Sequence, residues 1–338
     1  MMTKPNDSIR DRIKVLADLF AKKTRFVLMT HINPDGDAVG SCLALGLGLA
    51  SLNKKVTMFC QGGVPYLYDF LPESGQISPS PGAPEDYDIA VLLDCHTLER
   101  AGDQALAMAQ VPVLAVVDHH IVEGVSLPAH SLVDTGASAA GELVYYILTT
   151  LGVEITPEVA TNLFVAISTD TGSFSYENTN SGALSVCAEL VKSGAKPWDI
   201  FRRLHLNKSR ERLELLGLAL RGMTFHHQGQ VGAVTITSEM LSVTGAVSAD
   251  TEGIVEHPRS VKGVELAVLF RQTENAGYKV SLRSRGRVNA AALSQSFGGG
   301  GHHNAAGFHI KGSIEEVKKR VINAAGPLLP LAEDGGDR

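Results

Sequence analysis

Residues 31–37 read His-Ile-Asn-Pro-Asp-Gly-Asp and lie between a short apolar run, residues 25–30, and an Ala-, Leu- and Gly-rich stretch, residues 38–52. The apolar run predicts a strand and the later stretch a helix, while the proline delays that helix and the glycine permits a tight turn. In open α/β sheets such a loop presents its side chains at the carboxyl end of a strand, where ligands bind. The side chains concerned are His31, Asp35 and Asp37. Taken alone, the loop fits a turn with helix-capping aspartates equally well.

Two further apolar runs also end in residues that can bind metal. Ile89–Leu93 is a continuous hydrophobic run, typical of a strand in a parallel sheet covered on both faces, and it ends at Asp94. Val111–Val117 is a second such run and ends in the triplet Asp118-His119-His120. A lone histidine here is more often structural than functional. Successive strand ends that carry Asp or His favour a metal-binding site instead.

A fourth segment, Phe164–Phe174, contributes a carboxylate at Asp170 after another apolar run, and we expect it to follow a helix that begins near Pro157. All four segments are thus expected to follow buried strands. Ligands that converge from several strand ends are what a two-metal hydrolytic site needs. The sequence therefore predicts a metal-dependent phosphoesterase.

In this order, the motifs resemble those of the DHH phosphoesterases, a family named for the triplet at residues 118–120. The resemblance covers nearly the whole chain, because residues 298–308, Gly-Gly-Gly-Gly-His-His-Asn-Ala-Ala-Gly-Phe, are similar to the DHH-associated domain of the first type, DHHA1. Taken alone, this stretch could be a flexible linker. Its flanking residues favour an ordered loop whose backbone N–H groups approach a phosphate.

The resemblance implies six metal ligands: His31, Asp35, Asp37, Asp94, His119 and Asp170. His31 and Asp35 are expected to hold one ion. Asp37, His119 and Asp170 are expected to hold a second, and Asp94 to bridge the two. The catalytic set is Asp94, His120 and Asp118. Here His120 would contact the substrate phosphate and Asp118 would fix the tautomer of a histidine.

The family implies two divalent ions, manganese first, with magnesium or cobalt as substitutes. The ligand types by themselves are also compatible with zinc. No ligand is missing from any motif, which argues against a member that has lost its chemistry. Three neighbouring residues are interpreted as structural or peripheral: His96, Cys95 and His303.

The second half of the chain holds the expected substrate-binding residues. Lys279–Arg287 contains four cations and no acid, and such a run is usually a solvated strand edge, which is our interpretation of Arg285 and Arg287. The resemblance places Arg283 where a substrate phosphate is clamped, a task that suits the guanidinium fork. The full substrate-binding set is His120, Arg283, His302, Gly299, Gly300, Gly301 and Arg259.

A length of 338 residues predicts about two domains, and alternating strand and helix patterns predict an α/β fold. The expected organisation is an N-terminal DHH domain at 1–190, with a parallel sheet covered by helices on both faces. A helical connector at 191–222 and a smaller C-terminal α/β DHHA1 domain at 223–331 follow. The polar tail at 332–338 is expected to be disordered.

Composition restricts the class of protein further. The four cysteines form no C-x-x-C pair and are expected to be reduced, as in a cytoplasmic protein. We expect no signal peptide and no membrane span. The net charge of −6 argues against coating of long nucleic acid but not against a small anionic substrate. A homodimer is compatible with the sequence, although no segment marks an interface.

Within the family, this size and layout most resemble the bifunctional oligoribonucleases, or nano-RNases, which also act as 3′-phosphoadenosine-5′-phosphate phosphatases. The resemblance implies hydrolysis of very short oligoribonucleotides, including linear dinucleotides, to nucleoside 5′-monophosphates by a bridging hydroxide, and release of AMP from 3′-phosphoadenosine-5′-phosphate. A cleft between two domains would select short substrates. Two alternatives remain: an inorganic pyrophosphatase or exopolyphosphatase, and a nucleotide-binding regulator without catalysis.

Overall fold

The computed structural model describes residues 7–122, 124–273 and 277–330, and the chain divides into two compact units after Asn207. The division falls inside the predicted connector at 191–222, between helices α7 (Pro197–His205) and α8 (Arg210–Arg221). The domain bounds given above stay a prediction. The predicted disordered tail at 332–338 lies outside the described residues.

The first unit contains a six-stranded sheet in the order β3-β2-β1-β4-β5-β6, and every neighbouring pair in it is parallel. Its strands are β1 (Arg25–Thr30), β2 (Lys55–Phe59), β3 (Ile77–Ser78), β4 (Ile89–Leu93), β5 (Leu114–Asp118) and β6 (His130–Val133). The order reverses between β1 and β4, so the carboxyl ends of these two strands flank the switch point where α/β sheets bind ligands. The predicted parallel α/β architecture is confirmed.

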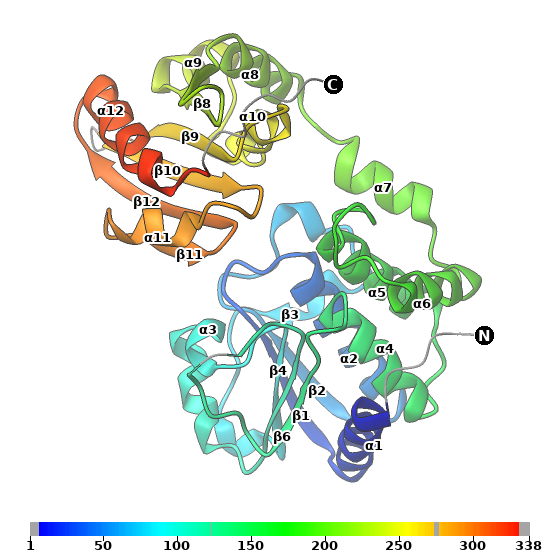
Figure 1. Ribbon diagram of the computed structural model, residues 1–338. Coiled ribbons are helices and arrows are strands. Elements are labelled where there is room, and N and C mark those ends of the chain that lie inside the picture. Colours follow the sequence, from blue (N-terminus) through cyan, green and yellow to red (C-terminus); the bar gives the residue numbers. More distant parts are fainter. Residues whose placement is uncertain (1–6, 123, 274–276, 331–338) are drawn as a thin grey trace. The chain divides into compact units, whose positions relative to one another are not determined.

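Both faces of this sheet are covered, and β1 shows how. Phe26 and Leu28 belong to one buried apolar cluster, whereas Val27 and Met29 belong to another on the opposite face. The helices of this unit are α1 (Asp7–Lys22), α2 (Gly36–Ser51), α3 (Leu98–Ala101), α4 (Ala140–Thr150), α5 (Pro157–Asp170), α6 (Ser181–Lys192) and α7, with short 3-10 helices at Tyr66–Tyr68, Ser74–Gln76, Pro84–Asp86 and Asp103–Gln110. Figure 1 shows α1, α2, α4 and α5 on one side of the sheet and α3 on the other.

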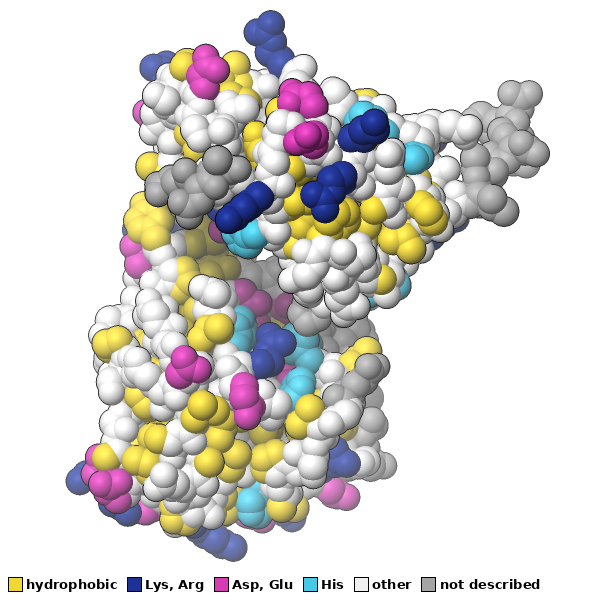
Figure 2. Space-filling model, turned by 90° about the vertical axis from the view of Figure 1, so that its left-hand side faces the viewer, with side chains coloured by type: hydrophobic (Ala, Val, Ile, Leu, Met, Phe, Trp, Pro, Cys, Tyr) yellow, Lys and Arg dark blue, Asp and Glu magenta, His cyan; other side chains and the backbone are white. Residues whose placement is uncertain are grey.

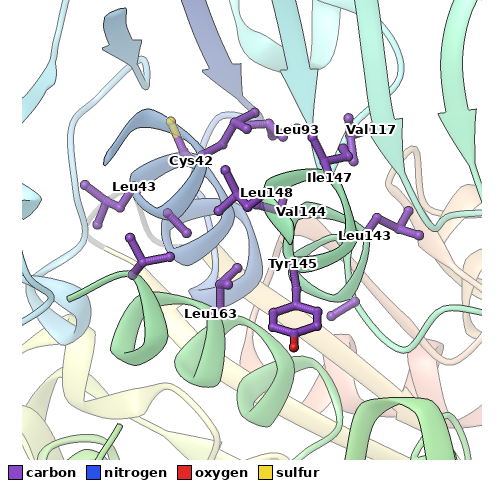
Figure 3. Close-up of a cluster of buried hydrophobic side chains, with 14 of the residues drawn as sticks. Cys42, Leu43, Leu93, Val117, Leu143, Val144, Tyr145, Ile147, Leu148 and Leu163 are labelled. Carbon is purple, nitrogen blue, oxygen red and sulfur yellow. The ribbon is translucent and has the colours of Figure 1, made fainter. Parts of the chain in front are cut away.

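The larger core joins α2, α4 and α5 to the sheet. Leu43 of α2, Leu148 of α4 and Leu163 of α5 lie together in it (Figure 3), and all three are fully buried. Burial of each such side chain stabilises the fold by about 1.5–3 kcal/mol. Helices α2 and α5 approach closely because Gly40 has no side chain. A Cβ atom built there would lie 2.4 Å from the carbonyl oxygen of Asn162.

The expectation that a strand precedes Asp170 was wrong. The helix does begin at Pro157, but it continues through the whole apolar run and ends at Asp170 itself. Thr156 caps it by accepting a hydrogen bond from the backbone N–H of Val159. Because α5 is buried on nearly all sides, apolar residues occur on every side of it and its sequence shows no 3.6-residue hydrophobic period. Periodicity alone cannot distinguish such a helix from a buried strand.

The second unit contains a smaller six-stranded sheet in the order β11-β12-β10-β9-β8-β7, in which only β8 and β9 pair in parallel. Its strands are β7 (Thr224–His226), β8 (Val231–Ile236), β9 (Leu266–Thr273), β10 (Gly277–Ser284), β11 (Gly300–His302) and β12 (Ala305–Lys311). Its helices are α8, α9 (Ser238–Thr244), α10 (Glu256–Ser260), α11 (Ala290–Gln295) and α12 (Ile314–Ala325), with 3-10 helices at Ser248–Thr251 and Gly326–Leu328. It has its own apolar cores.

Two segments of this unit, Lys279–Ser284 and Gly300–His302, are both paired within its sheet. The run from Lys279 to Ser284 is not a sheet edge, because β10 pairs with β9 on one side and β12 on the other. Arg285 and Arg287 follow the strand and are exposed. The glycine-rich stretch is not a linker, since Gly300–His302 pairs with β12. Among the described helices, none is long and apolar enough to cross a membrane.

Candidate metal centre

The loop after β1 places two aspartates at the start of α2. Asp35 is the N-cap of this helix, and its Oδ1 accepts hydrogen bonds from the backbone N–H groups of Asp37 and Ala38, each at 3.0 Å. Capping uses only one carboxylate oxygen. The capping and metal-ligand interpretations of this loop are therefore compatible.

Asp37 is fully buried and ties α2 to the start of α4. Its Oδ2 accepts a hydrogen bond from the N–H of Ala140 at 2.6 Å, and its Oδ1 accepts from the N–H of Gly141 and the hydroxyl of Ser41, each at 2.9 Å. The N–H groups at the first turn of a helix favour negative charge. These contacts hold a buried carboxylate in one orientation.

Asp94 lies at the end of β4, among three imidazoles. Its Oδ2 is 3.5 Å from Nε2 of His31, and its Oδ1 is 3.4 Å from Nε2 of His119 and 3.5 Å from Nδ1 of His120. These residues come from the ends of β1, β4 and β5, which are neighbours in the sheet. Figure 2 shows histidine side chains gathered with acidic and basic ones on one face of this unit.

Three groups of side chains place a ligand atom each within 4.8 Å of one another: His31, Asp35 and Asp94; Asp37, His119 and Asp170; and Asp94, His119 and His120. The structure thus brings all six predicted metal ligands together, along with His120. Asp170 reaches the site from the end of α5 rather than from a strand, with its Oδ2 3.5 Å from Nε2 of His119.

The donor set fits a divalent metal ion. Two buried atoms in the centre of the cluster, Oδ1 of Asp94 and Nε2 of His119, are 3.4 Å apart, and neither makes a hydrogen bond of good geometry in the described part of the chain. Buried polar atoms are normally satisfied, so an orphaned pair calls for an explanation such as an ion. Carboxylate oxygens and imidazole nitrogens without thiolates suit a fairly hard divalent cation.

The electrostatics of the cluster agree with this fit. Burial and the charge of Asp94 raise the pKa of Asp37 well above its ordinary range, and burial raises the pKa of Asp170 to about 6 against the opposing charge of His119. Burial disfavours the charged form of His119, but contact with Asp94 and the charges of the other two carboxylates outweigh it and raise its pKa to about 10. The carboxylates thus favour positive charge at the centre of the cluster. A divalent cation held by these residues would supply positive charge that offsets the repulsion among the carboxylates.

Asp118, at the end of β5, is fully buried and contacts histidines through both oxygens. Its Oδ1 accepts from the backbone N–H of His119 at 2.8 Å and from the backbone N–H and Nδ1 of His120 at 3.2 and 2.8 Å. Its Oδ2 lies 2.7 Å from Nδ1 of His96. Sequence reasoning had set His96 aside. The available signal was its position two residues after Asp94, since β4 and β5 are parallel neighbours and their ends meet at one edge.

The predicted phosphate-binding arginines of the second unit share one carboxylate. Nε of Arg283 is 3.2 Å from Oε1 of Glu256, and Nη2 of Arg259 is 2.7 Å from Oε2 of the same residue. Nη1 of Arg283 also donates to the carbonyl oxygen of Leu282 at 3.0 Å. The role of Glu256, on α10, was missed because nothing in its sequence neighbourhood distinguishes it. Both arginines are consequently held in place by the protein.

Two glycines of the glycine-rich stretch are required by the backbone. A Cβ atom at Gly299 would lie 2.4 Å from the carbonyl oxygen of Gly307, and Gly301 has a φ of 139°, which side-chain-bearing residues rarely adopt. Gly300 has open space where a side chain would stand. Ser294 braces the stretch by donating to the carbonyl oxygen of Gly307 at 2.8 Å. The side chain of His302 lies outside the described part of the structure.

Comparison with known proteins identifies the family. Residues 25–167 match the DHH family, N-terminal domain, and residues 238–326 match the DHHA1 domain. The bifunctional oligoribonuclease and PAP phosphatase NrnA of Thermus thermophilus is 32% identical to this chain over 97% of its length and 98% of the relative's. The chain belongs to the DHH family. It is therefore a hydrolase that acts on phosphoesters, as the resemblance implied.

Solved structures agree with this assignment to the DHH family. An exopolyphosphatase-related protein from Bacteroides fragilis superimposes with a TM-score of 0.87 at 28% identity, covering 94% of this chain and 97% of that one. RecJ from Thermus thermophilus, in complex with Mn²⁺, superimposes with a TM-score of 0.55 at 16% identity, covering 97% of this chain and 56% of that one. At this low identity, the likeness to RecJ concerns the fold alone. The cluster of carboxylates and imidazoles in this DHH protein could hold divalent metal.

Proposed function

We propose that this protein hydrolyses very short oligoribonucleotides, including linear dinucleotides, to nucleoside 5′-monophosphates, and 3′-phosphoadenosine-5′-phosphate to AMP. The NrnA relative, matched over almost its whole length, supports this substrate class. The observation that carries the proposal is the position of Asp94 between two proposed ligands, with its Oδ2 3.5 Å from Nε2 of His31 and its Oδ1 3.4 Å from Nε2 of His119. A shared carboxylate is suited to a pair of metal ions.

In this proposal His31 and Asp35 hold one ion, Asp37, His119 and Asp170 hold the other, and Asp94 holds both. Manganese is the first choice, with magnesium or cobalt as substitutes. Bound ions of this kind activate water and neutralise charge on the transferred phosphoryl group. The protein contributes a fixed set of ligands, because Asp37 is held by α4 and Asp35 by α2.

The remaining site residues would bind and orient the substrate. His120 is 40% exposed at the edge of the cluster, where its imidazole can contact a phosphate oxygen, and Asp118 fixes its ring through Nδ1. In the second unit, Arg283 and Arg259 supply guanidinium groups, and the backbone of the glycine-rich stretch supplies N–H groups. The described cysteines are all unpaired and buried, which supports a reducing compartment such as the cytoplasm.

The proposal is tested with purified protein and Mn²⁺ on three substrates in parallel: a 5′-phosphorylated diribonucleotide, 3′-phosphoadenosine-5′-phosphate and pyrophosphate. Release of nucleoside monophosphate from the first two, absent in Asp94→Asn, is the expected result. No turnover of either nucleotide by the wild-type protein would refute the proposal.

A second candidate function is hydrolysis of inorganic pyrophosphate or polyphosphate. It is favoured by the similarity to the exopolyphosphatase-related protein of Bacteroides fragilis. Addition of polyphosphate as a fourth substrate separates the two candidates. Turnover of pyrophosphate or polyphosphate without turnover of the nucleotides would select this second function.

A further inference from the structure

His96 lies in the loop after β4 and contacts the buried carboxylate at the end of the neighbouring strand. Its Nδ1 is 2.7 Å from Oδ2 of Asp118, a side chain with no exposed surface, and the side chain of His96 itself is only 14% exposed. The carboxylate accepts, so the proton of this hydrogen bond is on the imidazole nitrogen. The contact therefore fixes the orientation of His96 and of the carboxylate together.

The two oxygens of Asp118 bind different histidines. Oδ1 accepts from Nδ1 of His120 and from two backbone N–H groups, whereas His96 is the hydrogen-bond partner shown for Oδ2 in the described structure. A carboxylate is planar and rotates as one body about the bond to Cβ. A hydrogen bond that holds one oxygen consequently fixes the direction in which the other oxygen accepts.

This coupling matters for His120, because that side chain is 40% exposed and the orientation of its ring depends on the contacts it makes. Its one neighbouring ring in the described structure is that of His119, tilted at a centroid distance of 4.5 Å. Two carboxylates face Nδ1 of His120: Oδ1 of Asp118 makes a hydrogen bond at 2.8 Å, whereas Oδ1 of Asp94 is 3.5 Å away. The shorter contact with Asp118 therefore sets the direction of Nε2.

We propose that His96 is a positioning residue for phosphoester hydrolysis. By occupying one oxygen of Asp118 it holds the other oxygen, and through it the imidazole of His120, in the orientation that meets the substrate phosphate. This inference rests on the proposed function of His120. It assigns His96 no contact with substrate or metal.

Three substitutions at one position test the proposal. The side-chain amide nitrogen of asparagine can take the place of Nδ1 of histidine, whereas that of glutamine reaches the place of Nε2. We expect His96→Ala and His96→Gln to lower kcat by roughly 10–100-fold with KM little changed, the range seen for groups that orient catalytic side chains. His96→Asn should recover most of the activity.

Each other result decides against the proposal. Equal activity of all three variants and wild type would show that the contact is dispensable. Recovery by glutamine but not asparagine would show that His96 acts through Nε2, directly on substrate or metal. A fall in Mn²⁺ affinity that matches the fall in kcat, measured by titration calorimetry, would point to the metal centre instead.

A substrate-independent measurement separates this inference from the proposed function. In ¹⁵N–¹H NMR spectra at a single pH, the Nδ1 proton of His120 should be protected from exchange with water in wild type and His96→Asn. We expect that protection to be lost in the alanine and glutamine variants. An unchanged His120 signal in a folded His96→Ala protein overturns the proposal, even if the wild-type protein fails to cleave the diribonucleotide.

Discussion

At the scale of single residues, Asp94 combines an unusual backbone with the central chemical position. Its φ is +58°, a region that Asp and Asn enter more readily than other residues with a side chain. Contacts with His119 and His31 overcome the effect of burial and lower its pKa, so the group is an anion near neutral pH. Its φ and its charge both suit an aspartate at this position.

Asp94→Asn should abolish the activity with little change of fold, because asparagine tolerates the same φ and has nearly the same shape. We expect turnover to fall by on the order of 10²–10³-fold or more, the cost of removing one pre-organised charge-stabilising group. Steady-state kinetics with Mn²⁺ measure this. The control is Asp86→Asn, an exposed aspartate before the same strand, which should retain wild-type activity.

Arg283→Ala should mainly weaken substrate binding. Glu256 and the carbonyl oxygen of Leu282 hold this guanidinium in place, so its loss removes a fixed phosphate contact. We expect KM for the diribonucleotide to rise by roughly tenfold, about 1.4 kcal/mol, while kcat changes less. Lys279→Ala, an exposed cation on the same strand, is the matched control. If both variants raise KM equally, general charge rather than a specific contact explains the effect.

At the scale of elements, the position of Asp170, a proposed metal ligand at the end of α5, depends on how closely α5 packs against α2. Gly40→Ala should destabilise the protein by about 1–3 kcal/mol, because the new methyl group meets backbone of α5. Gly217→Ala is the opposite case. Its position in α8 is exposed with open space around it, so we expect a gain of about 0.5–1 kcal/mol. Denaturant unfolding measures whether the free energy of unfolding falls for Gly40→Ala and rises for Gly217→Ala.

Asp88 anchors the starts of β1 and β4, at the end of the sheet away from the proposed metal ligands. Its Oδ2 accepts from the hydroxyl of Thr24 at 2.7 Å, and its Oδ1 accepts from Nη2 of Arg25 at 2.8 Å. These hydrogen bonds from Thr24 and Arg25 hold the pKa of the carboxyl well below its usual range. The charged form is thus favoured by folding.

Asp88→Asn should therefore cost about 1–2 kcal/mol of stability at pH 7. A group whose pKa is lowered by folding stabilises the protein above its unfolded pKa, and this contribution is lost as the pH falls through the lower folded value. The difference in free energy of unfolding between wild type and Asp88→Asn should stay constant above about pH 4 and become smaller below it. Urea unfolding at a series of pH values measures it, and a difference independent of pH would contradict the assignment.

At the scale of the whole molecule, each unit has its own sheet and its own apolar cores, while all six proposed metal ligands belong to the first unit. Mn²⁺ should consequently stabilise that unit, by about 2.7 kcal/mol at a concentration one hundred times the dissociation constant. Hydrogen exchange read by mass spectrometry should show added protection in β1, β4 and β5 and none in β8–β10. In Asp94→Asn, Mn²⁺ should no longer add protection from exchange. Equal added protection in both units of the wild-type protein would contradict the assignment of all six ligands to the first unit.

The strands that carry the ligands could be predicted from sequence alone, because continuous apolar runs bounded by polar residues mark buried parallel strands. The expected runs at residues 25–30 and 89–93 coincide with β1 and β4. The next strand begins at Leu114 rather than Val111, since Pro112 has no N–H to donate to a ladder. The motifs also predicted the family, and the structure brings the predicted metal ligands together.

Tertiary structure alone decided the rest. Asp170 reaches the cluster on a helix, and His96 and Glu256 acquire their roles from partners 22 and 27 residues away, Asp118 and Arg283. A sequence pattern records the local period and the residue types of each segment. The partners of a side chain depend on strand order and on which helix faces pack together, and these arise only when distant segments assemble. The residue types of the proposed site could therefore be predicted from the sequence, whereas the residues that orient those side chains could not.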